Sequence, residues 1–421
     1  MGTTARPFSL SRRMPFRVGA AVEGRLLRAV ASRLGPADVR FAVGATAASA
    51  SRNPPVATVR FRDLRTLLAL ALDPAGRFGD AYAEGRVEVE GDLVAAIESV
   101  YRAMATKGRP SLLRRLGTYV PHTLPRDRRC VHHHYDLGND FYRLWLDARL
   151  LYTCAYFESE AQSLEQAQVA KMEHVCRKLG LRSGETVIEA GCGWGALALH
   201  MARHHGVRVR AYNVSSEQIA WARRLADEEG LSGRVEFLHE DYRRIDGRCD
   251  VFVSVGMLEH VGLANYRELA RVLTRTLDRE RGRGLLHFIG RDYPQPLDPW
   301  IRRRIFPGAY APTLDEACRG ALVPAGMSVV DVENLRPHYA LTLRHWRERY
   351  ERACSESRVG FDERFRRTWR LYLAGSEAAF RTGSMQLFQV VFAPSGANGA
   401  PWTRDALYRS ADGLVWNAPT S

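Results

Sequence analysis

A glycine-rich segment carries the clearest chemistry in this sequence of 421 residues: Glu189, Ala190, Gly191, Cys192, Gly193, Trp194 and Gly195. The run Thr186–Ala190 leads into it and predicts a buried strand, and a helical pattern follows over residues 197–204. Glycines let the backbone turn sharply and approach a ligand, and the first turn of a helix presents free N–H groups. The segment therefore predicts a loop that binds a ligand through its backbone.

Two classes of ligand use such a loop. Gly191-x-Gly193-x-x-Ala196 resembles a dinucleotide fingerprint, which requires an acidic residue at the end of the second strand. Residues 211–214, Ala-Tyr-Asn-Val, contain none. Methyltransferases that use S-adenosylmethionine (SAM) have the pattern E/D-x-G-x-G-x-G, and Glu189 stands where their acid precedes the first glycine. The loop favours SAM, with a nucleotide or a purely structural turn as alternatives.

The elements around this loop alternate between strand and helix. Ser163 and Gln166 form a capping-box pattern that starts a helix ending at Gly180. Four further strands are expected at 207–212, 235–238, 251–255 and 285–289, with helices at 217–229 and 266–277. Such alternation predicts a parallel sheet covered on both faces. Residues 131–395 are therefore expected to form an α/β, doubly wound, Rossmann-like catalytic domain.

The preceding residues predict a smaller, basic, mostly α N-terminal domain. We expect a disordered basic arm over 1–20, a lipid-engaging domain over 21–105 and a linker over 106–130. Within the domain, amphipathic stretches lie at 22–34, 64–72 and 93–104, and residues 43–56 suggest a loop. Residues 396–421 are expected to be a C-terminal tail.

Charge points to an anionic partner. The chain has 61 basic and 47 acidic residues, a net charge of +14, and residues 1–130 hold 22 basic and 11 acidic residues, or +11. Either nucleic acid or an anionic lipid surface fits such an excess. The basic arm has few interleaved aromatic residues on which single-stranded bases could stack, so we expect an anionic membrane surface and no nucleic acid.

The cysteines and the apolar runs indicate where in the cell the protein is located. Seven scattered cysteines without a C-x-x-C pair fit a reduced cytosol. The consecutive residues His132–His134 point in different directions and have no second ligand cluster, so we expect no metal site. No stretch is long and apolar enough to span a bilayer. We therefore expect a cytoplasmic protein peripherally associated with the inner face of the membrane.

Several ordered motifs resemble one known family. They include His-Tyr-Asp-Leu-Gly-Asn-Asp-Phe-Tyr at 134–142, Leu-Tyr-Thr-Cys-Ala-Tyr-Phe at 151–157, Gly-Met-Leu-Glu-His-Val-Gly at 256–262 and His-Tyr-Ala-Leu-Thr-Leu at 338–343. These motifs are similar to those of cyclopropane-fatty-acyl-phospholipid synthases and their mycolic acid relatives. The resemblance covers roughly residues 130–392, whereas the N-terminal third matches only loosely.

The resemblance implies a reaction and its partners. In this family SAM gives its methyl group to the cis double bond of an unsaturated phospholipid acyl chain, and a bound bicarbonate ion removes a proton from the resulting carbocation to close a cyclopropane ring. A homodimer is also implied. The bicarbonate ligands carry over as Cys154, Glu259, His287, Ile289 (through its backbone) and Tyr339. The SAM contacts carry over as Tyr152, Thr153, Glu189, Gly191, Cys192, Gly193, Trp194, Gly195, Asn213, Ser215, Gln218, Asp241 and Tyr242.

The chemistry sets further expectations. A carbocation survives only in a dry site, and aromatic faces can spread its charge. A dense group of rings could do this or simply form core: Phe141, Tyr142, Trp145, Tyr156 and Phe157. Cys154 has no activating base in sequence, so a ligand or packing role is expected rather than a nucleophile.

Alternative functions stay open from the sequence. The same carbocation could end as a methyl-branched, methylene or furan-precursor chain. A small-molecule O- or N-methyltransferase would not need bicarbonate. A basic binding protein with an inactive SAM fold would bind SAM without turnover. The complete set of expected bicarbonate ligands favours ring closure.

Overall fold

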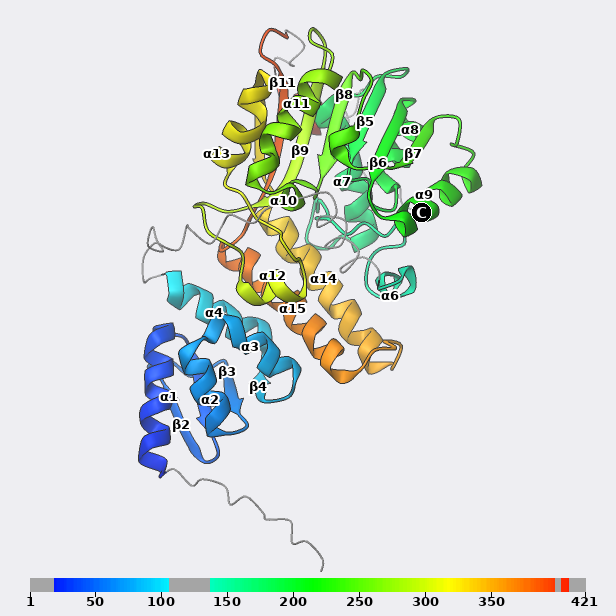
Figure 1. Cartoon of the computed structure of the whole chain (residues 1–421). Coiled ribbons are helices and arrows are strands. Elements are labelled where there is room, and N and C mark those ends of the chain that lie inside the picture. Colours follow the sequence, from blue (N-terminus) through cyan, green and yellow to red (C-terminus); the bar gives the residue numbers. More distant parts are fainter. Residues whose placement is uncertain (1–18, 106–136, 398–402, 409–421) are drawn as a thin grey trace, which may run out of the picture.

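The computed structural model of the chain describes residues 19–105, 137–397 and 403–408. Two folded parts are visible, an N-terminal domain and a larger catalytic domain (Figure 1). The expected linker at 106–130 lies outside the described residues, as do almost all of the arm at 1–20 and most of the tail at 396–421.

The catalytic domain is built on a seven-stranded sheet with the order β10-β11-β9-β8-β5-β6-β7. Five neighbouring strands, from β9 to the edge strand β7, are parallel, as the sequence predicts. β11 and β10 add an antiparallel edge that the sequence analysis did not anticipate. The strands are β5 (Thr186–Ala190), β6 (Arg208–Asn213), β7 (Val235–His239), β8 (Val251–Val255), β9 (Arg283–Gly290), β10 (Met327–Asn334) and β11 (Gln386–Pro394).

Helices cover both faces of this sheet, which confirms the doubly wound arrangement. In β5, Val187 packs with one group of helices and the next residue, Ile188, packs with the other. The first face is covered by α7 (Leu164–Leu179), α8 (Ala196–His205) and α9 (Ser216–Glu228), and the second by α11 (Tyr266–Thr276). The predicted capping box of Ser163 and Gln166 starts α7, and Gly180 ends it in the left-handed conformation.

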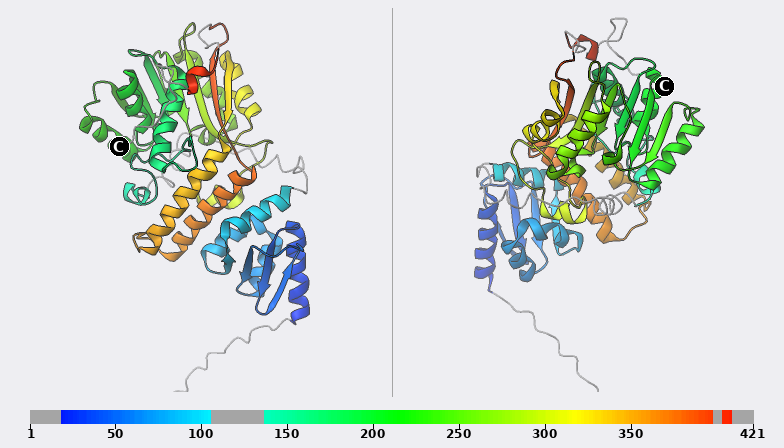
Figure 2. Two further views of the ribbon diagram at one scale, coloured as in Figure 1. Left: turned by 180° about the vertical axis from the view of Figure 1, so that it is seen from behind. Right: turned by 45° about the horizontal axis from the view of Figure 1, so that its top comes forward.

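Two long helices lie beyond the carboxyl edge of the sheet. They are α14 (Arg336–Ser355) and α15 (Glu363–Thr382), and they lie between the sheet and the N-terminal domain in the views of Figures 1 and 2. With the short helices α6 (Asn139–Arg143) and α12 (Pro299–Arg304), they hold a large buried cluster rich in aromatic residues. The shorter α10 (Leu258–Val261) and α13 (Leu314–Ala317) connect strands of the sheet, and α16 (Asp405–Tyr408) packs on α7.

The N-terminal domain is organised by a four-stranded sheet with the order β2-β1-β3-β4. The amphipathic stretches predicted at 22–34, 64–72 and 93–104 are helices. The expected loop at 43–56 is wrong in part, because Thr46–Ser49 pairs with β1 as an antiparallel strand. The elements are α1 (Ala20–Leu34), β1 (Val39–Val43), β2 (Thr46–Ser49), β3 (Ala57–Phe61), α2 (Leu64–Leu72), α3 (Pro74–Ala83), β4 (Val87–Gly91) and α4 (Leu93–Ala105).

The two domains are joined by close packing and ion pairs. Helix α15 packs on α3 and α4, and α12 packs on α3. The Trp300 ring lies so close to Gly79 that a Cβ there would approach its atoms to 2.4 Å. Asp80 accepts hydrogen bonds from Trp300 Nε1 at 3.2 Å and from Arg304 Nε at 3.0 Å. The N-terminal domain therefore rests on the helices that surround the aromatic cluster.

Across the described ranges, none of the helices combines the length and apolar character needed to cross a membrane.

Candidate active site

The glycine loop connects β5 to α8 at the carboxyl edge of the sheet. Gly191, Gly193 and Gly195 all have positive φ angles, of 84°, 54° and 87°. At Gly195 an added Cβ would come within 2.6 Å of the Phe237 ring, whereas at Gly193 it would meet no atom within 4 Å. Gly195 is thus needed for packing, and Gly193 faces open space in the pocket that it lines.

A pocket occupies the point where the strand order reverses, between β5 and β8 with β6 alongside. Parallel α/β sheets bind their ligands at this place. Eleven of the thirteen expected SAM residues line it. The two that do not are Gly195 and Ser215, which are the N-cap residues of α8 and α9. The lining residues from the expected set are Tyr152, Thr153, Glu189, Gly191, Cys192, Gly193, Trp194, Asn213, Gln218, Asp241 and Tyr242.

Asn213, at the end of β6, ties three parts of the pocket together. Its Nδ2 donates to the carbonyl oxygen of Gly193 at 3.2 Å and to Gln218 Oε1 at 2.7 Å. Its Oδ1 accepts from the backbone N–H of Val214 at 2.8 Å. Asn213 therefore fixes the glycine loop against the start of α9.

Glu189 and Asp241 are buried carboxylates with different surroundings. Asp241 accepts two side-chain hydrogen bonds from Arg243, at 2.7 and 2.9 Å. Glu189 Oε2 has no hydrogen-bond partner among the described residues, and burial raises the pKa of Glu189 to about 8. Lys171, which lines the same pocket, partly opposes this rise through its positive charge. Glu189 thus presents an unsatisfied acceptor at the base of the glycine loop.

Two side chains that the sequence analysis missed hold the segment before the pocket. Lys171 Nζ donates to Thr153 Oγ1 at 2.9 Å, and Gln168 Nε2 donates to the Thr153 carbonyl oxygen at 2.9 Å. Both come from α7 and are fully buried. Burial in α7 is therefore not confined to apolar residues, because these two polar side chains are enclosed together with its apolar ones. The sequence did contain one signal for Lys171: lysine is rare in this chain, which has only three, so each of them stands out.

The expected ligands Glu259 and Ile289 are in contact where β8 and β9 end, and His287 lies two residues before Ile289 on β9. Glu259 Oε1 accepts from the backbone N–H of Ile289 at 2.6 Å, and Glu259 Oε2 is a buried acceptor with no partner in the described part of the chain. Burial raises the pKa of Glu259 to about 7, and the bond from Ile289 only partly offsets it. The Ile289 N–H is therefore occupied. Its carbonyl points to the same side of the strand and is the backbone group left for a ligand.

His287 is held as a neutral ring with one defined tautomer. Burial lowers its pKa to about 3, and the positive charges of Lys171 and Lys178 act in the same direction. Gln389 Nε2 lies 3.1 Å from His287 Nδ1. An amide NH₂ can only donate, so Nδ1 is the acceptor and Nε2 carries the proton. His287 can thus donate one hydrogen bond from Nε2.

Cys154 and Tyr339 belong to the neighbouring aromatic cluster, with Ile289 packed against it. Cys154 Sγ donates to the carbonyl oxygen of Ala155 at 3.1 Å, and burial raises the pKa of its thiol. Thr342 Oγ1, one turn after Tyr339 on α14, accepts from the backbone N–H of Ala155 at 3.0 Å. This contact places the first half of α14, which carries Tyr339, next to Cys154 and Ala155. A protonated thiol fits the expected packing or ligand role.

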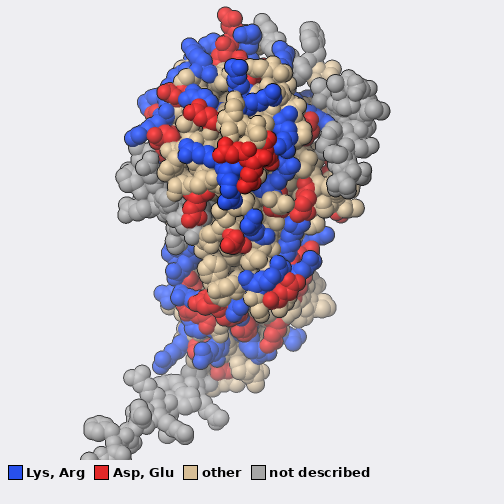
Figure 3. Space-filling model, turned by 90° about the vertical axis from the view of Figure 1, so that its right-hand side faces the viewer, with Lys and Arg blue, Asp and Glu red and all other residues tan. Residues whose placement is uncertain are grey.

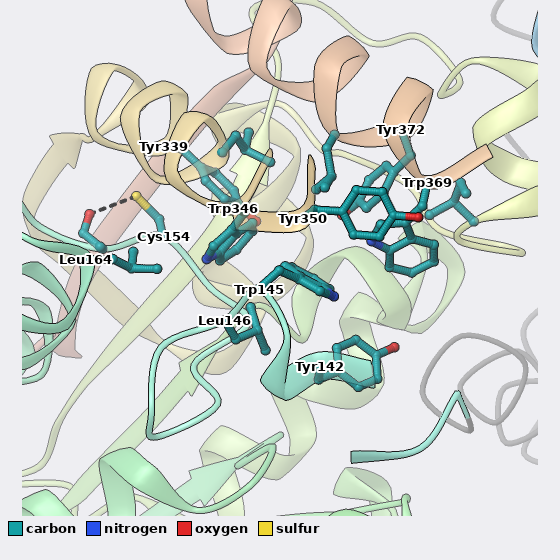
Figure 4. Packing of buried hydrophobic residues seen from close by; sticks show 14 of the residues in the cluster. Tyr142, Trp145, Leu146, Cys154, Leu164, Tyr339, Trp346, Tyr350, Trp369 and Tyr372 are labelled. Atoms are coloured by element: carbon teal, nitrogen blue, oxygen red, sulfur yellow. Dashed lines mark hydrogen bonds between the residues drawn. The ribbon is translucent and has the colours of Figure 1, made fainter. Parts of the chain in front are cut away.

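The aromatic group predicted from sequence divides into two sets. Phe141, Tyr142 and Trp145 join a buried cluster with rings from α14 and α15, shown in Figure 4. Tyr156 instead stacks between the rings of His174 and His338, with centroid distances of 4.2 and 4.8 Å. Phe157 stacks on His345. Figure 4 shows Tyr142 and Trp145 in one cluster with Trp346, Tyr350, Trp369, Tyr372 and Tyr339.

The residues present fit both expected ligands. For SAM, the loop leaves room beside Gly193, and Glu189 Oε2 is an unpaired acceptor in the pocket wall. For bicarbonate, which carries both a hydroxyl group and anionic oxygens, the unpaired Glu259 Oε2 supplies an acceptor and His287 Nε2 a donor. Met257 and His260, on either side of Glu259 in sequence, line the pocket at the glycine loop, so the two places adjoin.

Known proteins share both the sequence and the fold of this chain. A probable fatty acid methyltransferase of Pseudomonas putida is 36% identical over 84% of this chain and 92% of its own length. The cyclopropane-fatty-acyl-phospholipid synthase of Escherichia coli K12 is 40% identical over 63% of this chain and 68% of its own length. The tuberculostearic acid methyltransferase UfaA1 of Mycobacterium tuberculosis is 33% identical over 88% of this chain and 90% of its own length.

Solved structures agree with these relatives. The cyclopropane synthase MmaA2 of Mycobacterium tuberculosis superimposes with a TM-score of 0.60 at 31% identity, over 65% of this chain and 98% of that one. The mycolic acid cyclopropane synthase CmaA1, solved with SAH and CTAB, gives a TM-score of 0.59 at 30% identity, over 65% of this chain and 99% of that one. A family model described as mycolic acid cyclopropane synthetase matches residues 122–390. The match spans more than half of the chain, which therefore belongs to this family and is a SAM-dependent methyltransferase of the cyclopropane synthase type.

Proposed function

We propose that the chain transfers a methylene group from SAM to the cis double bond of unsaturated phospholipid acyl chains and forms cyclopropane fatty acids. The observation that carries this proposal is the buried pair of Glu259 and His287 beside the SAM pocket. One has an unpaired acceptor and the other a donor of defined tautomer. A methyltransferase acting on an oxygen or nitrogen atom would not need such an arrangement next to its pocket.

The roles of the two residues follow from their protonation. SAM, when bound, supplies an electrophilic methyl group, and bicarbonate, when bound, supplies a small base for the proton that the carbocation loses. His287 donates from Nε2 to an anionic oxygen of that base. Glu259 Oε2 accepts its hydroxyl and so orients it. Because both residues are buried, these hydrogen bonds form in a low-dielectric site where they are strongest.

The surrounding rings protect the reaction. Tyr142, Trp145 and Trp346 are fully buried in the adjoining cluster. They exclude water that would trap a carbocation as an alcohol. Their faces stabilise positive charge at close range. The aromatic cluster thus packs the core and also suits a cationic intermediate.

Mass spectrometry of lipids tests the proposal. The purified chain is incubated with SAM and vesicles of monounsaturated phospholipid, with and without added bicarbonate. We expect a gain of one CH₂ per acyl chain, loss of the double bond and a dependence on bicarbonate. A gain with a surviving double bond would contradict ring closure. No gain on any lipid would contradict the lipid substrate.

A methyl-branched or methylene fatty acid is the second candidate product. Two relatives that align over most of this chain carry the names fatty acid methyltransferase and tuberculostearic acid methyltransferase. The E. coli cyclopropane synthase aligns over a smaller share of it. Both reactions begin with the same methyl transfer and differ in which carbon of the carbocation then loses a proton. The double-bond readout above distinguishes the two.

We also propose that an anionic membrane surface presents the substrate, with the chain bound peripherally on the inner face of the membrane. The folded part of the N-terminal domain is nearly neutral, because residues 19–105 contain 11 basic and 10 acidic residues. The excess lies in residues 1–18, with four arginines and no acid, and in 106–130, with seven basic residues and one acid. Figure 3 shows basic and acidic side chains interspersed on one face of the folded body. These two segments are therefore the proposed contact.

Vesicle binding tests this assignment. Replacing Arg6, Arg12, Arg13 and Arg17 with serine is expected to weaken binding to phosphatidylglycerol vesicles at least about tenfold, because each basic residue near an anionic surface contributes roughly 1 kcal/mol. Binding to neutral phosphatidylcholine vesicles should not change. A control removes four arginines that have acidic partners on the catalytic domain: Arg224, Arg271, Arg319 and Arg344. Equal losses in both variants would contradict the role of the arm. A homodimer stays a prediction.

A further inference from the structure

A cluster of four ligand-type side chains joins α7 to α8, away from the pocket. It consists of Glu173 and Cys176 from α7 and of His200 and His205 from α8. Helix α8 starts at the glycine loop, and at 1.5 Å per residue His205 lies about 15 Å further along its axis. Neither the SAM pocket nor the Glu259–His287 pair uses these residues. Their chemistry is therefore unexplained by the methyl transfer.

Two overlapping sets of donor atoms make up the cluster. His200 Nε2 lies 3.3 Å and His205 Nε2 3.1 Å from the same carboxylate oxygen, Glu173 Oε2. The ligand atoms of Cys176, His200 and His205 all lie within 4.8 Å of one another. Cys176 and His200 are buried, and the side chains of Glu173 and His205 are 17% and 18% exposed. A small ion could thus reach the cluster from the His205 side.

We propose that Glu173, Cys176, His200 and His205 form a binding site for a divalent transition metal, with Zn²⁺ as the best match. Zinc bonds of about 2.0 to 2.3 Å in a tetrahedron place donor atoms roughly 3.3 to 3.8 Å apart. The two carboxylate–imidazole distances are already close to that range. The Cys176 thiol, which lies within 4.8 Å of both imidazole nitrogens, would have to move closer to Glu173 to complete the tetrahedron.

The ligand types and charges also fit zinc. One thiolate, two imidazoles and one carboxylate are the ligands that Zn²⁺ takes in proteins, whereas Ca²⁺ and Mg²⁺ take oxygen ligands. A thiolate and a carboxylate together carry two negative charges, so the bound site is neutral and tolerates burial. Arg177 Nε holds the other oxygen, Glu173 Oε1, at 3.2 Å. Such an outer partner fixes a metal-binding carboxylate in place.

The position of the site assigns it a structural role. Four protein ligands leave no open position for a substrate, as in structural zinc sites. Helix α7 also carries Lys171 and Gln168, which hold Thr153, and α8 begins at the glycine loop. A metal between the two helices would therefore brace two walls of the SAM pocket from behind. Among the parts of the chain that the structure describes, Cys176, His200 and His205 are the one group of three or more potential metal ligands whose atoms lie this close together.

The sequence offered only a faint signal for this site. The two helices contribute the patterns Glu-x-x-Cys at 173–176 and His-x₄-His at 200–205, which are 23 residues apart. The more visible histidine pattern is His132–His134, whose residues are adjacent in sequence. Spatial convergence between two helices cannot be read from spacing alone.

Metal content of the full chain tests the proposal. The protein is purified without chelator, loaded with ZnCl₂ alone and dialysed, and zinc is then measured by mass spectrometry with the unfolding temperature recorded in parallel. We expect one zinc per chain and a higher unfolding temperature. His205→Ala should lower the zinc affinity more than about 100-fold, beyond the 10–100-fold typical of losing an outer partner. His204→Ala, at the exposed neighbouring position, should keep the metal.

Cobalt provides a second readout that does not depend on stability or activity. Co²⁺ in the same site should show a thiolate-to-metal charge-transfer absorption, which Cys176→Ala removes and the control Cys318→Ala keeps. Loss of zinc on dialysis, equal zinc retention by His205→Ala, or a cobalt spectrum without the thiolate band would each overturn the proposal. Because neither readout uses turnover, such a failure says nothing against the proposed lipid reaction.

Discussion

Two carboxylates of the catalytic domain, the buried Glu259 and the partly buried Glu173, have opposite surroundings. Glu259 receives one backbone hydrogen bond and keeps its second oxygen unpaired, and burial raises its pKa to about 7. Burial acts on Glu173 in the same direction, but hydrogen bonds from His200 and His205 outweigh it and lower the pKa. One carboxylate is left unsatisfied beside a pocket, and the other is fully partnered at a helix pair.

This difference separates a reactive site from a structural one. An unpaired buried acceptor costs stability, and buried carboxylates with a raised pKa are enriched at sites that bind a ligand. A carboxylate with several partners instead holds elements together. His287 differs from the histidines of the second site in its partner: it meets the neutral amide of Gln389, whereas His200 and His205 share one carboxylate oxygen. The predictions below test whether the two carboxylates differ in function as they do in surroundings.

The largest effect is expected on turnover. Glu259→Gln and His287→Ala should each lower kcat roughly 10²–10⁴-fold, the range typical for groups that handle a proton in the transition state. SAM affinity should stay within a few-fold, because neither side chain lines the pocket. Product formation by mass spectrometry and SAM binding by calorimetry measure the two quantities separately.

Matched controls sharpen this result. Glu280→Gln and His204→Ala change exposed residues of the same types outside the site and should leave both quantities unchanged. A parallel loss of SAM affinity in Glu259→Gln would place that residue in the SAM site and not in proton handling. The contrast with Glu173 would then lose its functional meaning.

A smaller effect is expected on stability and its pH dependence. Folding raises the pKa of Glu259 from 4.5 to about 7, so the folded state resists ionisation and loses stability as the pH rises through this window. Glu259→Gln cannot ionise and should be more stable than the unchanged chain by about 3 kcal/mol at pH 8.5 and by about 1 kcal/mol at pH 5.5. Denaturant unfolding at the two pH values measures the difference. A variant less stable at pH 8.5 would contradict the unsatisfied state of Glu259.

The sequence predicted the central parallel strands of the catalytic domain, which are buried on both faces of the sheet. The runs Thr186–Ala190 and Val251–Val255 match β5 and β8 residue for residue, because a central parallel strand is a continuous apolar run. It missed β10, whose residues are half exposed, and β2, a short Ala- and Ser-rich edge strand. Exposed edges lack the apolar pattern on which such predictions depend.

Polar residues inside the fold account for what the site prediction lacked. Strand β11 is buried along its whole length yet contains Gln386 and Gln389, and Gln389 sets the tautomer of His287. Lys171 likewise interrupts the apolar pattern of α7. A buried polar residue needs a hydrogen-bond partner, which another strand or helix often supplies. The sequence of one strand or helix does not reveal that partner.

The smallest effect is expected from replacing one of two buried lysines on α7. These lysines allow the same comparison, between a residue at the pocket and one away from it, for positive charges. Lys171 donates to Thr153 at the pocket, whereas Lys178, two turns later, pairs with Glu333 at 2.5 Å. Lys171→Met should weaken SAM binding about tenfold, the free energy of one lost charge-assisted hydrogen bond. Lys178→Met leaves Glu333 with His174 as its remaining partner, so it should lower the unfolding temperature without changing SAM affinity. The two lysines are both buried and differ only in their partners. Equal effects of the two variants on SAM binding would therefore mean that Lys171 acts through stability alone.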